Sequence, residues 1–493
     1  MSILEKVIES TCKYIEKMPK EQRKQYGQFF TGKETAKFMA ELLTIPENTD
    51  NINILDPGAG SGVLSAALIE RLLTCNGIKF IHLTCYETDN NIIELLFENL
   101  TYIKNNIPLM FTFDILQENY ITTQADDYNG TLCATDEPTK YDLVIGNPPY
   151  KKIAKDADEA LAMPDICHGT PNLYFLFFQM SLFNLKDNGE MVYIIPRSWT
   201  SGAYFKAFRQ KFLDEGVIEH IHLFISRDKV FDSVLQETII IKVKKTSEIP
   251  DFVTVTSTEN SHCFSEITTF KAPYTTVVSG KDRYVYLVTS QDDVETLNRL
   301  NKLKDTLPSI GLKMKTGLTV DFRNRELLRN EAEEQAVPLF YPQHIRDGKV
   351  MFPVGKENEY ILTQQQGLLQ KNANYLFVKR FTTKEEHRRL QCGVYIARKH
   401  ISYDRISTQN KINFIDGLKE LSECVVYGLY VLFNSTLYDT YYRILNGSTQ
   451  VNSTEVNSMP MPSMSIIESM GKELIKSRDM SEISCNRILR SYI

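Results

Sequence analysis

The segment from Tyr141 to Tyr150, with the sequence YDLVIGNPPY, places the strongest constraint on the fold of this chain. Residues Tyr141 to Ile145 form a short apolar run with the length and composition of a buried parallel strand. Gly146 ends the run, and the two prolines after Asn147 prevent further ladder pairing and stiffen the backbone. We therefore expect a rigid turn at the carboxyl edge of a sheet, where open α/β folds bind ligands. An ordinary Pro-rich turn is the alternative interpretation.

The groups in Asn147-Pro148-Pro149-Tyr150 suit an exocyclic amine on a nucleobase. Such an amine is a poor nucleophile because its lone pair is delocalised into the ring. The Asn147 side-chain oxygen and the Pro148 carbonyl can each accept one N–H, which localises the lone pair and directs it at an electrophile. The Tyr150 ring offers a face on which a base can stack. This arrangement needs no covalent nucleophile.

A glycine-rich turn lies about ninety residues earlier, between a predicted strand at Asn51–Leu55 and a predicted helix at Val63–Leu73. The turn is Asp56–Gly62, Asp-Pro-Gly-Ala-Gly-Ser-Gly, and such a turn lets a ligand approach the backbone and the helix N-terminus. Its G-x-G-x-G spacing differs from the dinucleotide fingerprint, and it lacks a P-loop lysine. The turn therefore predicts a ligand site without identifying the ligand.

Two acids follow the next predicted strands. Glu87 closes Phe80–Tyr86, and Asp114 closes Phe111–Phe113. A carboxylate after the second strand suits a ribose diol, because it can accept both hydroxyls. Each acid alone is typical of a solvated strand end, but their recurrence after the glycine-rich turn favours a binding site. Thr31 or Thr35 is a candidate cap for a helix that runs to about Leu43.

Strand and helix patterns continue to about residue 250 and predict an α/β, doubly wound, mostly parallel sheet with one antiparallel strand. The later elements are a helix at Asn172–Leu185, a strand at Glu190–Ile195, a helix at about 202–214, and strands at Val217–Phe224 and Glu237–Val243. We expect a catalytic domain at 1–245, a connector at 246–309, and a mixed α+β domain at 310–493. In the last domain we expect short strands with loops to about 460, a helix at Ser463–Ser477, and a tail.

Positive charge concentrates in the later domain, although the chain has a formal net charge of −6. Nine Lys/Arg and only three acids lie between Lys379 and Lys411. This cluster is a candidate phosphate-binding surface, with a solvated face as the alternative. The candidate contacts are Lys379, Arg380, Arg388, Arg389, Arg398 and Lys399.

The composition is that of a globular protein, with 42% hydrophobic and 24% charged residues. Nine scattered cysteines without C-x-x-C spacing predict reduced thiols and no zinc site. The N-terminus has no signal-peptide pattern, and the longest apolar stretch, Leu173–Leu185, is too short to span a bilayer. We therefore expect a cytoplasmic protein without a membrane partner.

The motifs occur in the order of a known family: Gly27-Gln-Phe-Phe-Thr31, the turn Asp56–Gly62, Asn147–Tyr150, and then a large C-terminal region. This arrangement resembles the gamma-class N6-adenine DNA methyltransferases of restriction–modification systems, including the Taq and Pst types. The resemblance covers nearly the whole chain and includes Leu445–Asn452. It implies a class I methyltransferase fold with a C-terminal target-recognition domain, S-adenosylmethionine as methyl donor, no metal, and transfer to N6 of an adenine flipped out of double-stranded DNA.

The resemblance also implies residue roles. The donor would be held by Thr31, Asp56, Gly58, Gly60, Glu87 and Asp114, with Glu87 on the ribose and Asp114 on the adenine amine. The target adenine would be held by Asn147, Pro148 and Tyr150. Phe231 falls where the family places a second stacking aromatic, with a core phenylalanine as the alternative. Gly58 is a departure, since many relatives have Ala there; the tight turn tolerates the change.

Other activities use the same amine chemistry. N6-adenine RNA methyltransferases and protein glutamine methyltransferases also carry Asn-Pro-Pro-Tyr, but they are generally shorter and lack a region like 310–460. C5-cytosine methylation is excluded because the chain has no Pro-Cys pair. A non-catalytic DNA-binding module would not need the glycine-rich turn. No nuclease carboxylate–Lys cluster is apparent, so a cognate restriction endonuclease would be a separate partner.

Overall fold

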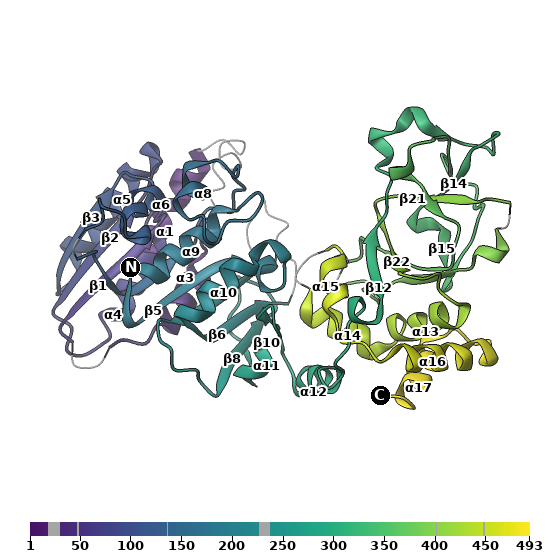
Figure 1. Cartoon of the computed structure of the whole chain (residues 1–493). Coiled ribbons are helices and arrows are strands. Elements are labelled where there is room, and N and C mark those ends of the chain that lie inside the picture. The colour runs from purple at the N-terminus through teal and green to yellow at the C-terminus, as the bar shows by residue number, and fades with distance from the viewer. Residues whose placement is uncertain are drawn as a thin grey trace. The chain divides into compact units, whose positions relative to one another are not determined.

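A computed structural model of the chain describes residues 1–17, 30–46, 49–135, 137–225, 237–383, 385–400, 402–446 and 449–493. The described residues divide into two compact units, Met1–Thr289 (unit 1) and Ser290–Ile493 (unit 2), which Figure 1 shows in purple to teal and in green to yellow. The predicted connector at 246–309 is therefore shared between the units, with most of it in unit 1.

Nine of the strands that the structure describes in unit 1 form one sheet of order β3-β2-β1-β4-β5-β7-β6-β8-β9, and β10 pairs separately with β11. The strands from β3 to β5 run parallel, and β7 runs antiparallel to both of its neighbours. The predicted doubly wound sheet with an antiparallel member is thus confirmed; β9 adds a second antiparallel strand at the edge. The strands are β1 Asn51–Pro57, β2 Phe80–Tyr86, β3 Met110–Leu116, β4 Tyr141–Gly146, β5 Leu185–Pro196, β6 Val217–Phe224, β7 Thr238–Lys244, β8 Phe252–Thr258 and β9 Thr268–Pro273.

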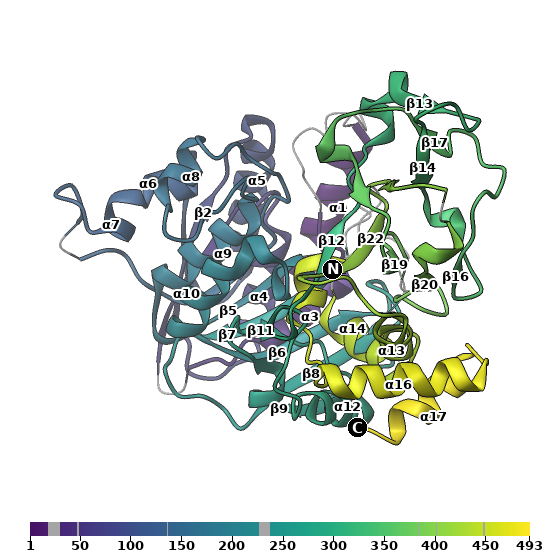
Figure 2. The same ribbon diagram turned by 45° about the vertical axis from the view of Figure 1, so that its right-hand side comes forward.

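Helices cover both faces of this sheet (Figures 1 and 2). One layer contains α1 Ile3–Lys17, α3 Lys33–Leu42, α4 Val63–Leu72 and α5 Asn90–Asn106, which pack on one another over β1 and β2. The other contains α9 Leu173–Asn184 and α10 Lys206–Glu215. Helix α9 is apolar all round and almost wholly buried, as expected for a helix enclosed on several sides. The shorter elements are α6 Tyr120–Thr123, α7 Ala125–Asn129, α8 Asp158–Ala162, η1 Arg197–Thr200, η2 Ala203–Phe205, α11 Tyr274–Val277, β10 Val278–Ser279 and β11 Tyr284–Val285.

The described residues of unit 2 contain two sheets, whose strands lie between Leu312 and Gly417. One has the order β12-β22-β19-β20-β16-β15 and the other β13-β17-β14-β21-β18. Phe340, Phe377 and Tyr395 are fully buried in their shared core. The strands are β12 Leu312–Thr316, β13 Leu328–Arg329, β14 Val337–Phe340, β15 Ile345–Arg346, β16 Lys349–Val350, β17 Tyr360–Ile361, β18 Gln370–Lys371, β19 Tyr375–Lys379, β20 Cys392–Tyr395, β21 Arg405–Thr408 and β22 Ile412–Gly417; 3₁₀ turns occur at Pro308–Ile310, Asp321–Arg323, Arg325–Leu327, Pro342–His344, Gln366–Leu368 and Ala397–Lys399.

A helical layer packs against the first sheet of unit 2, with α13 on β19 and β20. Helices α13 and α16 cross very closely: a Cβ on Gly428 would lie 1.9 Å from the Ile467 carbonyl oxygen. Figure 1 shows these helices in yellow below the sheets. The helices of unit 2 are α12 Gln291–Leu300, α13 Glu423–Phe433, α14 Thr436–Leu445, α15 Ser453–Ser458, α16 Met464–Ser477 and α17 Glu482–Arg490.

The sequence predicted strands and loops where the structure has α13, α14 and α15, and a tail where it has α17. Both predictions were wrong. Helix α13 is apolar nearly all round, so its sequence lacks the 3.6-residue period that distinguishes a helix from a buried strand. Helix α17 carries a visible signal, since the Ser481 side chain caps it by accepting the Ser484 N–H. Across the described parts of both units, the structure contains no helix that is long and apolar enough to cross a membrane.

Candidate active site

The glycine-rich turn joins β1 to α4 and is fixed to the neighbouring strand. The amides of Gly58 and Ala59 both donate to the Tyr86 carbonyl, at 2.8 and 3.0 Å. Gly62 caps α4 with φ +81°, and a Cβ there would lie 2.9 Å from Leu96 Cδ1. Glycine is required at this position because both the backbone conformation and the packing exclude a side chain. The turn therefore presents its backbone, and the positive end of α4, at the carboxyl edge of the sheet.

Glu87 lies directly after β2 and is held by three backbone amides. Its Oε2 accepts the Gly60 N–H at 2.9 Å, and its Oε1 accepts the N–H groups of Thr88 and Asp89 at 2.7 and 2.9 Å. Burial raises the pKa of Glu87, while the amides of Asp89, Thr88 and Gly60 oppose that rise. A carboxylate offers about four lone-pair positions and the three amides occupy three of them, so Oε2 can still accept one ligand hydroxyl.

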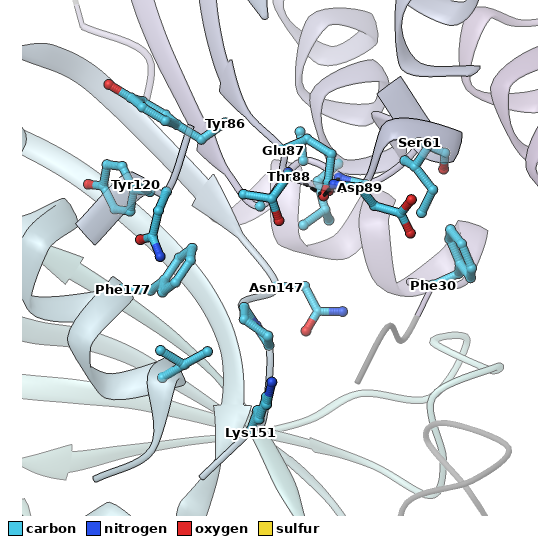
Figure 3. A pocket seen from close by; sticks show the side chains of 18 of the residues that line it. Phe30, Ser61, Tyr86, Glu87, Thr88, Asp89, Tyr120, Asn147, Lys151 and Phe177 are labelled. Carbon is cyan, nitrogen blue, oxygen red and sulfur yellow. Dashed lines mark hydrogen bonds between the residues drawn. The ribbon is translucent and has the colours of Figure 1, made fainter. Parts of the chain in front are cut away.

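Strand β4 ends at Gly146, and the next residue, Asn147, projects into the same region (Figure 3). A Cβ on Gly146 would lie 2.9 Å from the Tyr193 ring of β5, so glycine lets the strand end against that ring. The Asn147 Nδ2 donates to Thr31 Oγ1 at 3.2 Å. The Tyr150 hydroxyl lies 2.9 Å from Asn147 Oδ1 and 2.8 Å from the Ile194 carbonyl oxygen. The carboxamide is thus held at both ends.

These elements surround a cavity of about 420 Å³ in unit 1. That volume lies within the range of small-molecule sites. Asn119 and Glu159 join across its wall through a 2.8 Å hydrogen bond, which ties the segment after β3 to α8. In Figure 3, Glu87, Thr88 and Asp89 lie together above Asn147. The cavity is lined by Phe30, Thr31, Gly58, Ala59, Gly60, Ser61, Val63, Leu64, Tyr86, Glu87, Thr88, Asp89, Ile92, Glu118, Asn119, Tyr120, Asn147, Pro149, Lys151, Glu159, Leu173 and Phe177.

The structure brings together several of the residues that the sequence singled out. Five of them line the cavity: Thr31, Gly58, Gly60, Glu87 and Asn147. Pro148 is buried beside it, and Tyr150 reaches it through Asn147. The Tyr150 ring stands edge-on to Tyr174, with 6.3 Å between ring centroids. Gly27, Gln28, Phe29 and Phe231 lie outside the described residues.

Two predicted donor-binding acids do not line the cavity. Strand β3 continues through Ile115 to Leu116, so Asp114 is not at its end; its side chain is 65% exposed and lies 3.4 Å from His82 Nε2. Asp56 is 1% exposed, and its Oδ2 accepts the Ser65 hydroxyl at 2.6 Å. Asp56 therefore stabilises the turn by linking the end of β1 to Ser65 on α4. The predicted helix cap is also wrong, because Gly32 occupies the N-cap position of α3 and no side chain caps it.

The basic cluster in unit 2 divides into buried and accessible members. Arg389 is 1% exposed and hydrogen-bonds Thr382 and Asn446. Arg388 pairs with Glu482 at 3.0 Å and donates to the carbonyls of Phe433, the last residue of α13, and Ser435. The predicted phosphate contacts at Arg388 and Arg389 are therefore corrected to packing and ion-pair roles. The other four candidates, Lys379, Arg380, Arg398 and Lys399, are at least partly exposed.

Comparison with known proteins agrees with this geometry. Residues 67–231 match the Eco57I restriction-modification methylase family. Over 466 residues the chain is 35% identical to Type II methyltransferase M.BsuBI from Bacillus subtilis, which covers 92% of this chain and 91% of that protein. The chain belongs to the type II methyltransferases of restriction–modification systems. It is also 33% identical to Type II methyltransferase M.PstI from Providencia stuartii, over 92% of this chain and 90% of that protein. The resemblance to Pst-type enzymes is thereby confirmed.

A solved structure shows the same fold over the whole length of this methyltransferase. The Type IIL restriction-modification enzyme MmeI, determined in complex with DNA, aligns with a TM-score of 0.57 and covers 99% of this chain and 73% of that one. The sequence identity is 13%, so the likeness establishes fold alone.

Several residues that line the methyltransferase's cavity were missed by sequence reasoning. Glu118 and Asn119 follow the true end of β3, and Phe177 lies on α9. The apolar pair Ile115-Leu116 after Asp114 was the available signal that the strand continued, which would have moved its predicted end to Leu116, two residues before Glu118. Phe177 carried no such signal, because every neighbour on α9 is equally apolar.

Asp56 gives the stability of unit 1 a predicted pH dependence. Burial, and secondarily the charge of Glu87, raises the pKa of Asp56 to about 7, against hydrogen bonds from Ser65. Within the described residues its Oδ1 has no hydrogen-bond partner. Between about pH 4 and 7 the unfolded chain has lost this proton and the folded chain retains it, so stability falls as the pH rises. We expect Asp56→Asn to remove this pH dependence from the free energy of unfolding. Between pH 4.5 and 8, the free energy of unfolding of the variant should increase relative to that of the wild type by on the order of a few kcal/mol. Urea titrations followed by Trp199 fluorescence check this; parallel pH profiles would contradict it.

Proposed function

We propose that this methyltransferase transfers a methyl group from S-adenosylmethionine to N6 of an adenine in double-stranded DNA. The observation that carries the proposal is the convergence of the Gly58–Ser61 turn, Glu87 and Asn147 on one cavity. The type II methyltransferases that match over most of the chain support the same reaction class. The DNA substrate would place the enzyme in the cytoplasm, with any cognate restriction endonuclease as a separate protein.

The cavity residues fit the proposed donor. Glu87 Oε2 retains acceptor capacity for one ribose hydroxyl, and the turn offers a backbone that a ligand can approach closely. The side chains of Ile92, Leu173 and Phe177 give the cavity an apolar wall that excludes water. When bound, S-adenosylmethionine supplies an electrophilic methyl group on its sulfonium centre.

The residues after β4 fit the proposed target. Asn147 Oδ1 and the Pro148 carbonyl would accept the two N–H bonds of the adenine amine, which localises its lone pair on nitrogen. The Tyr150 hydroxyl has one proton and two acceptors within reach, Asn147 Oδ1 and the Ile194 carbonyl. It can therefore donate to Ile194 when the amine engages Asn147. A base inside a duplex cannot reach this position, so the adenine would be flipped out.

We further propose that unit 2 is the target-recognition domain. The flipped base carries no information about its neighbours, so the flanking duplex must be read by other contacts. The exposed candidates for phosphate contact are now Arg398 and Lys399, with Lys379 and Arg380 partly exposed. Arg398 pairs with Glu423, a surface ion pair that a phosphate can replace at small cost.

Product analysis tests the proposed function directly. We expect the protein, incubated with deuterated-methyl S-adenosylmethionine and unmethylated plasmid, to yield labelled N6-methyldeoxyadenosine after digestion to nucleosides. Parallel incubations with RNA and with a protein containing the release-factor glutamine motif serve as controls and should stay unlabelled. Labelled cytosine, or label confined to RNA or protein, would contradict the proposal.

A further inference from the structure

The hydrogen bond between Asn147 and Thr31 points to a role for Thr31 beyond lining the donor cavity. We propose that Thr31 is a positioning residue that holds the Asn147 carboxamide in the orientation needed to accept the target amine. This inference rests on the proposed function above. It assigns to Thr31 an effect on methyl transfer rather than on donor affinity.

The two residues come from distant parts of unit 1. Thr31 precedes α3, and Asn147 follows β4, 116 positions later. Thr31 is 6% exposed, so its hydroxyl has little access to water. The position suggests a helix cap, but Gly32 is the N-cap residue of α3 and no side chain caps that helix. The Thr31 hydroxyl is instead used on Asn147, at 3.2 Å from Nδ2.

The orientation of a carboxamide decides what it presents to an amine. Its oxygen can accept an N–H from the amine, whereas its nitrogen carries only N–H donors and cannot accept one. In the structure, Nδ2 faces Thr31 and Oδ1 faces the Tyr150 hydroxyl. Thr31 therefore occupies the nitrogen end and leaves the oxygen end on the side of Tyr150, the residue proposed to stack on the base. Without Thr31, the partly buried Nδ2 loses this hydrogen bond, and the carboxamide is less firmly held in its present orientation.

The chain supplies a matched control four residues later. Thr35 is 3% exposed, and its hydroxyl donates to the Ser261 carbonyl at 2.9 Å. It does not line the cavity. Thr31→Val and Thr35→Val thus each remove one buried threonine hydroxyl with the same change of shape, and they differ in whether the hydroxyl contacts Asn147.

The experiment uses the full chain, labelled S-adenosylmethionine and an unmethylated duplex plasmid under single-turnover conditions. We expect Thr31→Val to slow transfer about tenfold, as expected for loss of one orienting hydrogen bond. Donor affinity measured by calorimetry should stay within about twofold, and Thr31→Ser should restore most of the rate. Thr35→Val should leave the rate unchanged. In the Asn147→Ala background, Thr31→Val should have almost no further effect, since Thr31 acts through Asn147.

Three outcomes would overturn the inference: wild-type transfer by Thr31→Val, weakened donor binding with an unchanged saturated rate, or equal loss in Thr35→Val. Should Thr31→Val not fold, Thr31→Ala takes its place in the same comparison. If the wild-type protein forms no N6-methyladenine, the proposed function is contradicted. That result differs from the three outcomes that would overturn the inference about Thr31.

Discussion

Replacing Asn147 by alanine will slow methyl transfer by roughly 10²- to 10³-fold, the usual loss when one preorganised polar group at a reacting centre is removed. The adenine amine loses the acceptor that localises its lone pair, and Pro148 alone cannot hold both N–H bonds. Donor affinity should remain near wild type, because Glu87 and the glycine-rich turn are unchanged. Folding should also survive, since Asn147 is only partly buried at the edge of the sheet.

Single-turnover transfer and calorimetric donor binding together check this prediction. Asn147→Asp is the matched variant, because it retains an acceptor of the same shape and should transfer faster than Asn147→Ala. If Asn147→Ala transfers methyl groups at a rate within a few-fold of wild type, Asn147 does not take part in the reaction. A parallel loss of donor affinity would mean that Asn147 belongs to the donor site.

The mostly parallel, doubly wound sheet and the ligand site at its carboxyl edge could be predicted because their signals are local. The apolar run before Gly146, the glycines after Asp56 and the strand at Phe80–Tyr86 each lie within one element and its turn. The carboxyl ends of neighbouring parallel strands then meet at one edge of the sheet, so Glu87 and Asn147 converge without further information. This part of the site follows from sequence order alone.

The misplaced residues depend on contacts between distant elements. Asp114 lies two residues before the end of β3 and Glu118 two residues after it, because the pairing of β3 with β2 continues to Leu116, opposite Tyr86. Arg388 and Arg389 read as surface cations, because their sequence neighbourhood is polar and basic. Their partners lie on later segments, at Glu482 and Asn446, which no local pattern connects to them.

Arg389 should therefore behave as a core residue of unit 2, and Arg389→Ala should destabilise that unit by about 3 kcal/mol or more. Its guanidinium donates to Thr382 Oγ1 at 3.1 Å and to Asn446 Oδ1 at 3.0 Å. Its carbon lies 5.6 Å from the Tyr442 ring centroid. The substitution removes both of these buried hydrogen bonds and opens a cavity. Arg398→Ala is the matched control, because that side chain is 72% exposed and its pair with Glu423 contributes at most about 1 kcal/mol.

The single tryptophan of the sequence, Trp199, is buried in unit 1 and lets the two units be followed separately. In urea, we expect Arg389→Ala to shift the circular-dichroism transition to lower concentration, with a smaller shift in the Trp199 fluorescence transition. Arg398→Ala should shift neither, but it should weaken duplex binding and lower its salt dependence by about one unit of slope if Arg398 contacts a phosphate. An Arg389→Ala protein of wild-type stability with weakened DNA binding would mean instead that this guanidinium turns outward to the duplex, as the basic sequence around it first indicated.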